Sequence, residues 1–198
     1  MSKFTKLIAI GTVSAVSLMG AGVASGATVS GPASTPHSSA THALTVKKVA
    51  FRATVTGKMA LLWNASTVVA TSVSGKGSAT NLGVAALSGK GSAPFTGAAQ
   101  CEPMLGTGTL SGAGSKIMLS VAKSTVQSGQ ACGAAQSAPT AVTVQKGVAK
   151  VTGGTGKYKG VSGTLSFKAT FSIQSTTSGT AESDSFSATL TGTLTVKS

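Results

Sequence analysis

Acid–base chemistry in this chain would depend on carboxylates, because both histidines lie outside the segment that reads as a folded domain. The chain contains only three carboxylates: Glu102, Glu182 and Asp184. Glu182 and Asp184 are two residues apart, so on a strand both side chains would point to the same side. Glycoside hydrolysis needs two carboxyl groups that flank a cleft at a defined separation. The polar run 180–185 instead indicates an acidic hairpin tip, and we expect no catalytic residue.

Nucleophilic catalysis and phosphate binding are also disfavoured. The sequence has no Gly-x-Ser-x-Gly elbow, and the domain has no histidine to activate a serine. A phosphate-binding loop would need Ser or Thr after a Gly-Lys pair and then a helix. Here Tyr158 follows Gly156-Lys157, and a strand is predicted next. We expect no cofactor and no metal site, since His37 and His42 lie in a Ser/Thr/Pro-rich segment.

The first 27 residues have the pattern of a signal peptide. Lys3 and Lys6 precede an apolar run over 7–19 that Ser and Gly interrupt and that is too short for a stable span. Small residues over 24–27 offer a cleavage site. Residues 28–45, rich in Ser, Thr and Pro, are expected to form a flexible linker. The mature chain shows no further apolar run long enough for a span, so we expect a secreted or cell-surface protein with its folded domain over 46–198.

The two cysteines, Cys101 and Cys132, are predicted to form a disulfide. An even pair without metal-ligand spacing in an exported protein is most simply a structural bridge. The bridge would close a loop with a sequence separation of 132 − 101 = 31 residues, which is worth roughly 3–4 kcal/mol in lost chain entropy.

The charge balance is strongly basic. The formal net charge is +13, and without Lys3 and Lys6 it is 13 − 2 = +11. Such a charge favours polyanions, such as anionic cell-wall polymers or lipid headgroups. Nucleic acid is not expected, because aromatic residues and arginines are scarce and the chain is predicted to be exported. Dispersed lysines that only keep a Thr/Ser/Gly-rich barrel soluble are the alternative.

Period-two alternation dominates the chain from residue 46 onward. The clearest strands cover 165–173 and 186–197, with apolar residues on one face and Ser, Thr and Lys on the other. A first strand over 49–55 is expected to end at Gly57, with 59–63 as its hairpin partner. The hexapeptide Ser-Gly-Lys-Gly-Ser-Ala occurs at 74–79 and 88–93 and indicates two neighbouring strands with glycine kinks. Further strands are expected over 104–110, 117–126, 141–144 and 147–152.

These patterns predict an all-β fold of eight to ten short antiparallel strands in one domain. A β-barrel is the first interpretation and a β-sandwich the alternative. An immunoglobulin-like sandwich is disfavoured, because that fold has its tryptophan between two cysteines, whereas Trp63 precedes both cysteines here.

A glycine-dense turn stands before the strand at 165–173. It carries five glycines around one aromatic residue: Gly153, Gly154, Gly156, Gly160 and Gly163, with Tyr158 between them. This turn resembles the Gly-Gly-[Thr/Ser]-Gly-x-[Tyr/Phe]-x-Gly-x-x-Gly signature of allene oxide cyclase and dirigent-like barrels, and of small secreted bacterial proteins that share it. The resemblance covers about twenty residues and implies an eight-stranded antiparallel barrel.

Two functions follow as hypotheses. The first is a non-catalytic exported barrel that binds an anionic envelope component or a small apolar ligand, with Tyr158, Lys157 and Lys159 as candidate ligand-binding residues. The second, implied by the resemblance, is a cyclase- or dirigent-type barrel that steers a reactive apolar intermediate. A deep pocket with polar and aromatic lining would favour the second, and an interior filled by side chains the first. Tyr158 also fits a plug over the barrel end.

Overall fold

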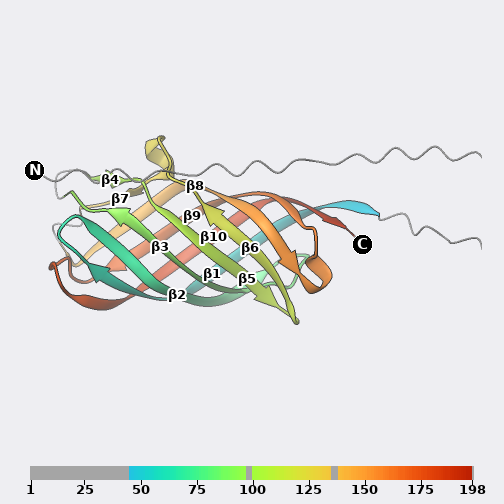
Figure 1. Ribbon diagram of the computed structural model, residues 1–198, viewed down its shortest axis with the longest axis horizontal. Coiled ribbons are helices and arrows are strands. Elements are labelled where there is room, and N and C mark those ends of the chain that lie inside the picture. Colours follow the sequence, from blue (N-terminus) through green and yellow to red (C-terminus); the bar gives the residue numbers. More distant parts are fainter. Residues whose placement is uncertain (1–44, 97–99, 135–137, 198) are drawn as a thin grey trace, which may run out of the picture. The chain divides into compact units, whose positions relative to one another are not determined.

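The computed structural model describes residues 45–96, 100–134 and 138–197. The predicted signal peptide (1–27) lies outside the described residues, as does the predicted linker (28–45) except for Thr45. The described chain folds into a closed eight-stranded antiparallel barrel with two additional short strands, as Figure 1 shows. The predicted barrel is confirmed, and the sandwich alternative is wrong. No helix among the described residues has the length and apolar character needed to cross a membrane.

Ten strands make up the sheet. They are β1 (Val46–Trp63), β2 (Thr67–Ala79), β3 (Ala86–Pro94), β4 (Cys101–Glu102), β5 (Leu105–Gly112), β6 (Ser115–Val121), β7 (Ala131–Cys132), β8 (Thr140–Thr155), β9 (Ser162–Ile173) and β10 (Ala181–Lys197). Around the barrel the order is β1, β2, β3, β5, β6, β8, β9 and β10, and β10 pairs with β1 to close it. The short β4–β7 pair is attached through β8.

The prediction that β1 ends at Gly57 is wrong. β1 continues without interruption to Trp63, and its hairpin partner is β2. Gly57 lies opposite Gly75, where a Cβ atom on Gly57 would collide with the backbone of Ser74. This glycine therefore permits two strands to approach closely and does not form a turn.

One further strand prediction is confirmed, and two others are wrong in their boundaries. The repeated hexapeptides do fall on the neighbouring strands β2 and β3, with Ser74 opposite Ser88. The segments predicted over 141–144 and 147–152 are one strand, β8, because a bulge between Val144 and Gly147 shifts the register without ending it. β6 stops at Val121, short of the predicted end at residue 126.

The interior contains two clusters of buried side chains. The larger packs around Leu110, Ile117, Leu165 and Leu194, all fully buried, and includes Tyr158. The smaller includes Met59, Leu61, Trp63, Ile173 and Phe186. We call the barrel end with the β8–β9 turn (156–161) the turn end, and the opposite end, near β4 and β7, the cavity end (Figure 1).

Candidate ligand-binding cavity

A cavity of about 540 Å³ occupies the barrel interior toward the cavity end. Its volume falls within the range of about 300–1,000 Å³ that is typical of small-molecule sites. Most of its lining is apolar, contributed by β1, β2, β3, β5, β8, β9 and β10. The aromatic members are Trp63, Phe95, Phe167, Phe171 and Phe186. The barrel is therefore filled by side chains at the turn end and hollow toward the cavity end.

Small residues at inward positions create this hollow. On β3 and β5 glycines occupy successive inward positions, with Gly89 opposite Gly108 and Gly91 opposite Gly106. On β9 and β10 the facing pair Ala169 and Ala188 lines the same cavity. Side chains normally fill the interior of an eight-stranded barrel, so their absence at these positions leaves an open volume.

Three of the four β3–β5 glycines are also needed for the close approach of the strands. A Cβ atom would lie 2.6 Å from the carbonyl oxygen of Thr107 at Gly89, and 2.7 Å from cross-strand carbonyl oxygens at Gly91 and Gly106. Gly108 differs, because its Cβ atom would meet nothing closer than 3.5 Å, at the Leu87 side chain. A larger residue at 108 thus fits the backbone and enters the cavity.

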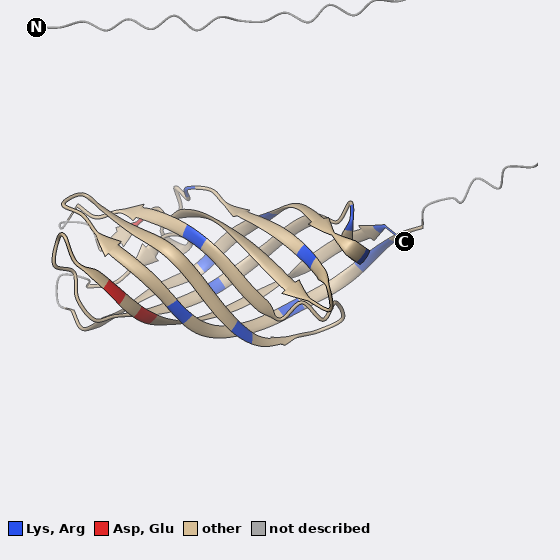
Figure 2. Cartoon of the chain, turned by 60° about the horizontal axis from the view of Figure 1, so that its bottom comes forward, with Lys and Arg blue, Asp and Glu red and all other residues tan. Residues whose placement is uncertain are grey.

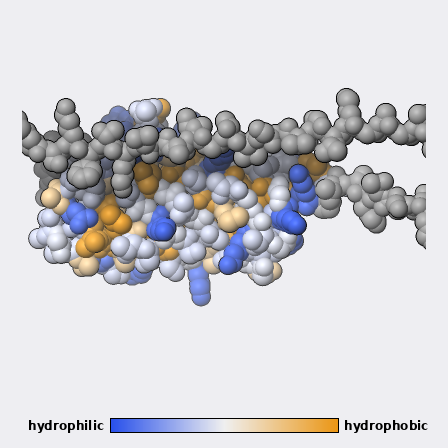
Figure 3. All heavy atoms as spheres, viewed as in Figure 1, coloured by the Kyte–Doolittle hydropathy of each residue, from blue (hydrophilic) through white to orange (hydrophobic). Residues whose placement is uncertain are grey.

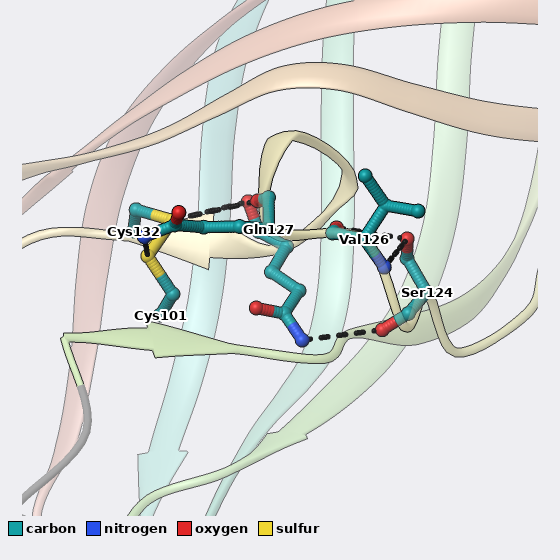
Figure 4. The surroundings of a disulfide bond; sticks show 6 residues. Cys101, Ser124, Val126, Gln127 and Cys132 are labelled. Carbon is teal, nitrogen blue, oxygen red and sulfur yellow. Dashed lines mark hydrogen bonds between the residues drawn. A yellow bond between two sulfur atoms is a disulfide. The ribbon is translucent and has the colours of Figure 1, made fainter.

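The disulfide-linked β4–β7 pair forms one part of the cavity rim. Cys101 and Cys132 are bonded to each other and lie directly opposite in register, which confirms the predicted disulfide. Their neighbours Gln100, Glu102 and Ala131 line the cavity. The Gln127 amide donates a hydrogen bond to the Cys101 sulfur over 3.3 Å (Figure 4). The bridge therefore holds chain segments that border the cavity.

Ser124 fixes the segment that leads into β7. Its hydroxyl donates a hydrogen bond to the carbonyl oxygen of Val126 and accepts one from the Val126 backbone N–H, at 3.1 and 3.2 Å. The Gln130 amide donates to the carbonyl oxygen of Ser124 over 3.2 Å. These local bonds are typical of a serine turn and lead into the short 3-10 helix η1 (Gln127–Gly129) that precedes β7.

Aromatic and carboxylate groups meet at another part of the rim. Trp63 packs edge-on against Phe95, with ring centroids 5.0 Å apart. The indole N–H of Trp63 donates a hydrogen bond to Glu182, whose second oxygen accepts one from the Ser175 backbone N–H at 2.8 Å. Thr96 donates to the Glu102 carboxylate at 2.8 Å. The rim is thus polar and hydrogen-bonded around an apolar interior.

Asp184 is buried near this rim. It is 1% exposed, lies opposite Met59 in register, and neither carboxylate oxygen has a hydrogen bond of normal geometry. Burial raises the pKa of Asp184 to about 6, and the neighbouring Glu182 carboxyl adds to the effect. The expectation that Glu182 and Asp184 form an acidic hairpin tip is therefore wrong. Both lie in β10, and Asp184 is not among the residues that line the cavity.

The residues singled out in the glycine-dense turn lie at the turn end, away from the cavity. Tyr158 is 3% exposed and donates its hydroxyl hydrogen to the carbonyl oxygen of Leu82, so it plugs that end. Lys157 and Lys159 are exposed, and none of the three lines the cavity.

The glycines of this turn have a structural role. Gly156 and Gly160 have φ values of 60° and 77°, a conformation that favours glycine. Gly153 and Gly163 also have positive φ, and at Gly154 the carbonyl of Tyr158 leaves no room for a Cβ atom.

Sequence reasoning missed the residues that make the cavity. The sequence feature that marks the cavity is a small residue at every second position of a strand. The glycines of Gly89-Lys-Gly91 and Gly106-Thr-Gly108 are examples. From the sequence, the glycines of the repeated hexapeptide indicate only kinks in the strands. Whether these glycines lie opposite one another and line the same cavity depends on the strand register, which the sequence pattern does not determine.

No protein-family model, curated protein or solved structure matches the chain.

Proposed function

We propose that the protein is exported and binds a small apolar molecule inside the barrel. The observation that carries this proposal is the cavity of about 540 Å³ with an apolar lining, kept open by glycine and alanine at inward positions. Filling it would remove apolar surface of both ligand and protein from water, at about 25 cal/mol per Å². The export part is supported by the signal-peptide pattern and by the disulfide.

Binding is favoured over catalysis by the chemistry of the lining. Among the described residues around the cavity, the ionisable side chains are Lys90 and Glu102, and Glu102 is held by Thr96 at the rim. A cyclase- or dirigent-type function would need a reacting or steering group in contact with the ligand. The half-buried Glu182 and the buried Asp184 are close to the rim, but neither is among the residues that line the cavity.

The resemblance of the turn to allene oxide cyclase and dirigent-like barrels stays a proposal. It is supported by the barrel architecture and by the position of the motif, which connects β8 to β9 and closes one end. In this chain the motif supplies a plug and the ligand site lies elsewhere.

Titration with the apolar dye Nile red tests the proposal. Trp63 is the only tryptophan and lines the cavity, so its emission reports binding independently of the dye signal. We expect saturable one-to-one enhancement of the dye, quenching of Trp63 at the same midpoint, and displacement by a long-chain alcohol. Dye enhancement that does not saturate, or that leaves Trp63 emission unchanged, would contradict a site within the barrel.

A further inference from the structure

Charge is unevenly distributed along the barrel. The three carboxylates lie toward the cavity end: Glu102 borders the cavity, and Glu182 and Asp184 stand at the start of β10 beside Leu61 and Met59. Figure 2 shows red segments toward that end and several blue segments near the C-terminus at the other. The lysines of the turn end therefore have no carboxylate near them among the described residues.

Six exposed lysines come together at the turn end from four different parts of the chain. They are Lys47, Lys48, Lys116, Lys157, Lys159 and Lys197. The pairing of β1 with β10 aligns Val46 with Lys197, and the pairing of β6 with β8 places Lys116 opposite Thr155, just before the turn. Figure 3 shows hydrophilic side chains grouped at this end and more separated elsewhere on the visible face.

Two of these lysines lie against the closed end of the barrel. The Lys157 ammonium lies 5.1 Å from the centroid of the buried Tyr158 ring, a cation–π distance. The Lys197 side chain lies over Gly160, since a Cβ atom built there would be 3.3 Å from the Lys197 Cδ. The charges are therefore presented from a closed barrel end and not from loose loops.

The neighbouring sequence does not neutralise this charge. From Leu7 to Val46 the chain contains no Asp, Glu, Lys or Arg. Cleavage at the predicted site would leave no Asp, Glu, Lys or Arg side chain between the new N-terminus and Lys47. Val46, 60% exposed, lies among them and offers an apolar contact.

We propose that the turn end docks on an acidic lipid bilayer through these six lysines. Lysines near an anionic bilayer each add to its attraction within about a Debye length of the surface. Six lysines around one end of a closed barrel can approach the same bilayer surface, and Val46 can enter the interface. Lysines grouped at one closed end of the barrel, together with an exposed apolar residue, fit a bilayer better than a flexible wall polymer. Docking in this way points the ligand cavity away from the membrane.

Co-sedimentation of the exported chain with vesicles tests the docking. Phosphatidylcholine vesicles containing one-third phosphatidylglycerol are compared with pure phosphatidylcholine, at about 0.1 M and about 1 M salt, where the Debye length falls from about 10 to about 3 Å. The test variant replaces Lys47, Lys157 and Lys159 with glutamine. The matched control replaces Lys123, Lys146 and Lys168, exposed lysines elsewhere on the barrel, and changes the net charge by the same amount.

We expect binding to the acidic vesicles only, lost at high salt, and weakened at least tenfold in the test variant but less than threefold in the control. Equal weakening by both variants would show that binding depends on the net charge of the protein and not on the lysines of the turn end, and would overturn the proposal. Tighter binding to soluble polyphosphate than to the vesicles would overturn the lipid assignment, and no vesicle binding would overturn the proposal altogether. Nile red titration of each variant shows that the barrel is folded and keeps this result separate from the cavity proposal.

Discussion

The indole N–H of Trp63 on β1 donates a hydrogen bond to the carboxylate of Glu182 on β10, the neighbouring strand of the barrel. Trp63 itself is 3% exposed and lines the cavity. The bond therefore connects the ligand site to the carboxylate pair that begins β10.

Trp63→Phe removes this donor and keeps an aromatic ring in the wall. We expect the free energy of unfolding to fall by about 1–3 kcal/mol, because a partly buried carboxylate loses a hydrogen bond. Glu182→Gln keeps an acceptor for the indole and should cost less. Urea unfolding followed by circular dichroism measures both, and equal costs would show that the bond contributes little.

Asp184 makes stability depend on pH. Its pKa rises from an ordinary value near 3.8 to about 6 in the folded protein. The folded state thus binds more protons than the unfolded state between these values, so the free energy of unfolding falls as pH rises from about 4 to about 6. The loss amounts to up to about 3 kcal/mol.

The variant Asp184→Asn should remove that part of the pH dependence and make the protein more stable than wild type at neutral pH. Unfolding midpoints measured across pH 4 to pH 8 give the comparison. A variant as pH-dependent as wild type over this window would show that Asp184 is not the group responsible.

Tyr158 is expected to contribute stability and not ligand affinity. Tyr158→Phe loses the hydroxyl that bonds the Leu82 carbonyl and should cost about 0.5–1.5 kcal/mol, whereas Tyr158→Ala should cost about 3–5 kcal/mol through loss of packing. Nile red affinity should stay unchanged in Tyr158→Phe. Weaker dye binding at unchanged stability would instead support the prediction that Tyr158 binds a ligand.

The alternation of side chains was sufficient to predict an all-β fold, its last two strands and the core face of each, whereas the preference for a barrel over a sandwich also drew on the resemblance of the turn. Leu165 and Leu194, both fully buried, were placed inward from the pattern alone. The disulfide was predictable because only two cysteines exist. The cavity was not, because a glycine on a strand indicates either a kink or a hollow, and only register places Gly89 opposite Gly108. The burial of Asp184 was missed for a similar reason, since a polar sequence around a carboxylate does not reveal which face of the sheet it joins.

Removing the disulfide should destabilise the protein and loosen the cavity rim. Replacing Cys101 and Cys132 together with serine releases a loop with a sequence separation of 31 residues, which should cost roughly 3–4 kcal/mol. Because Gln100, Glu102 and Ala131 line the cavity, we also expect faster release of Nile red. Stopped-flow displacement measures the rate, and an unchanged rate in a folded variant would show that the β4–β7 pair does not restrain the ligand.

The cavity itself is tested most directly by filling it. Gly108→Leu and Ala188→Leu place side chains into the hollow from β5 and β10, and a Cβ atom at 108 has room. Their controls, Thr109→Leu and Ser187→Leu, add the same side chain at the neighbouring positions on the outer face. The measurement is the Nile red dissociation constant of all four variants, with the unfolding midpoint of each as a check of folding. We predict at least tenfold weaker binding for the two filled variants and unchanged binding for the two controls. Binding as tight in Gly108→Leu and Ala188→Leu as in wild type would contradict the proposal that the ligand occupies the barrel interior.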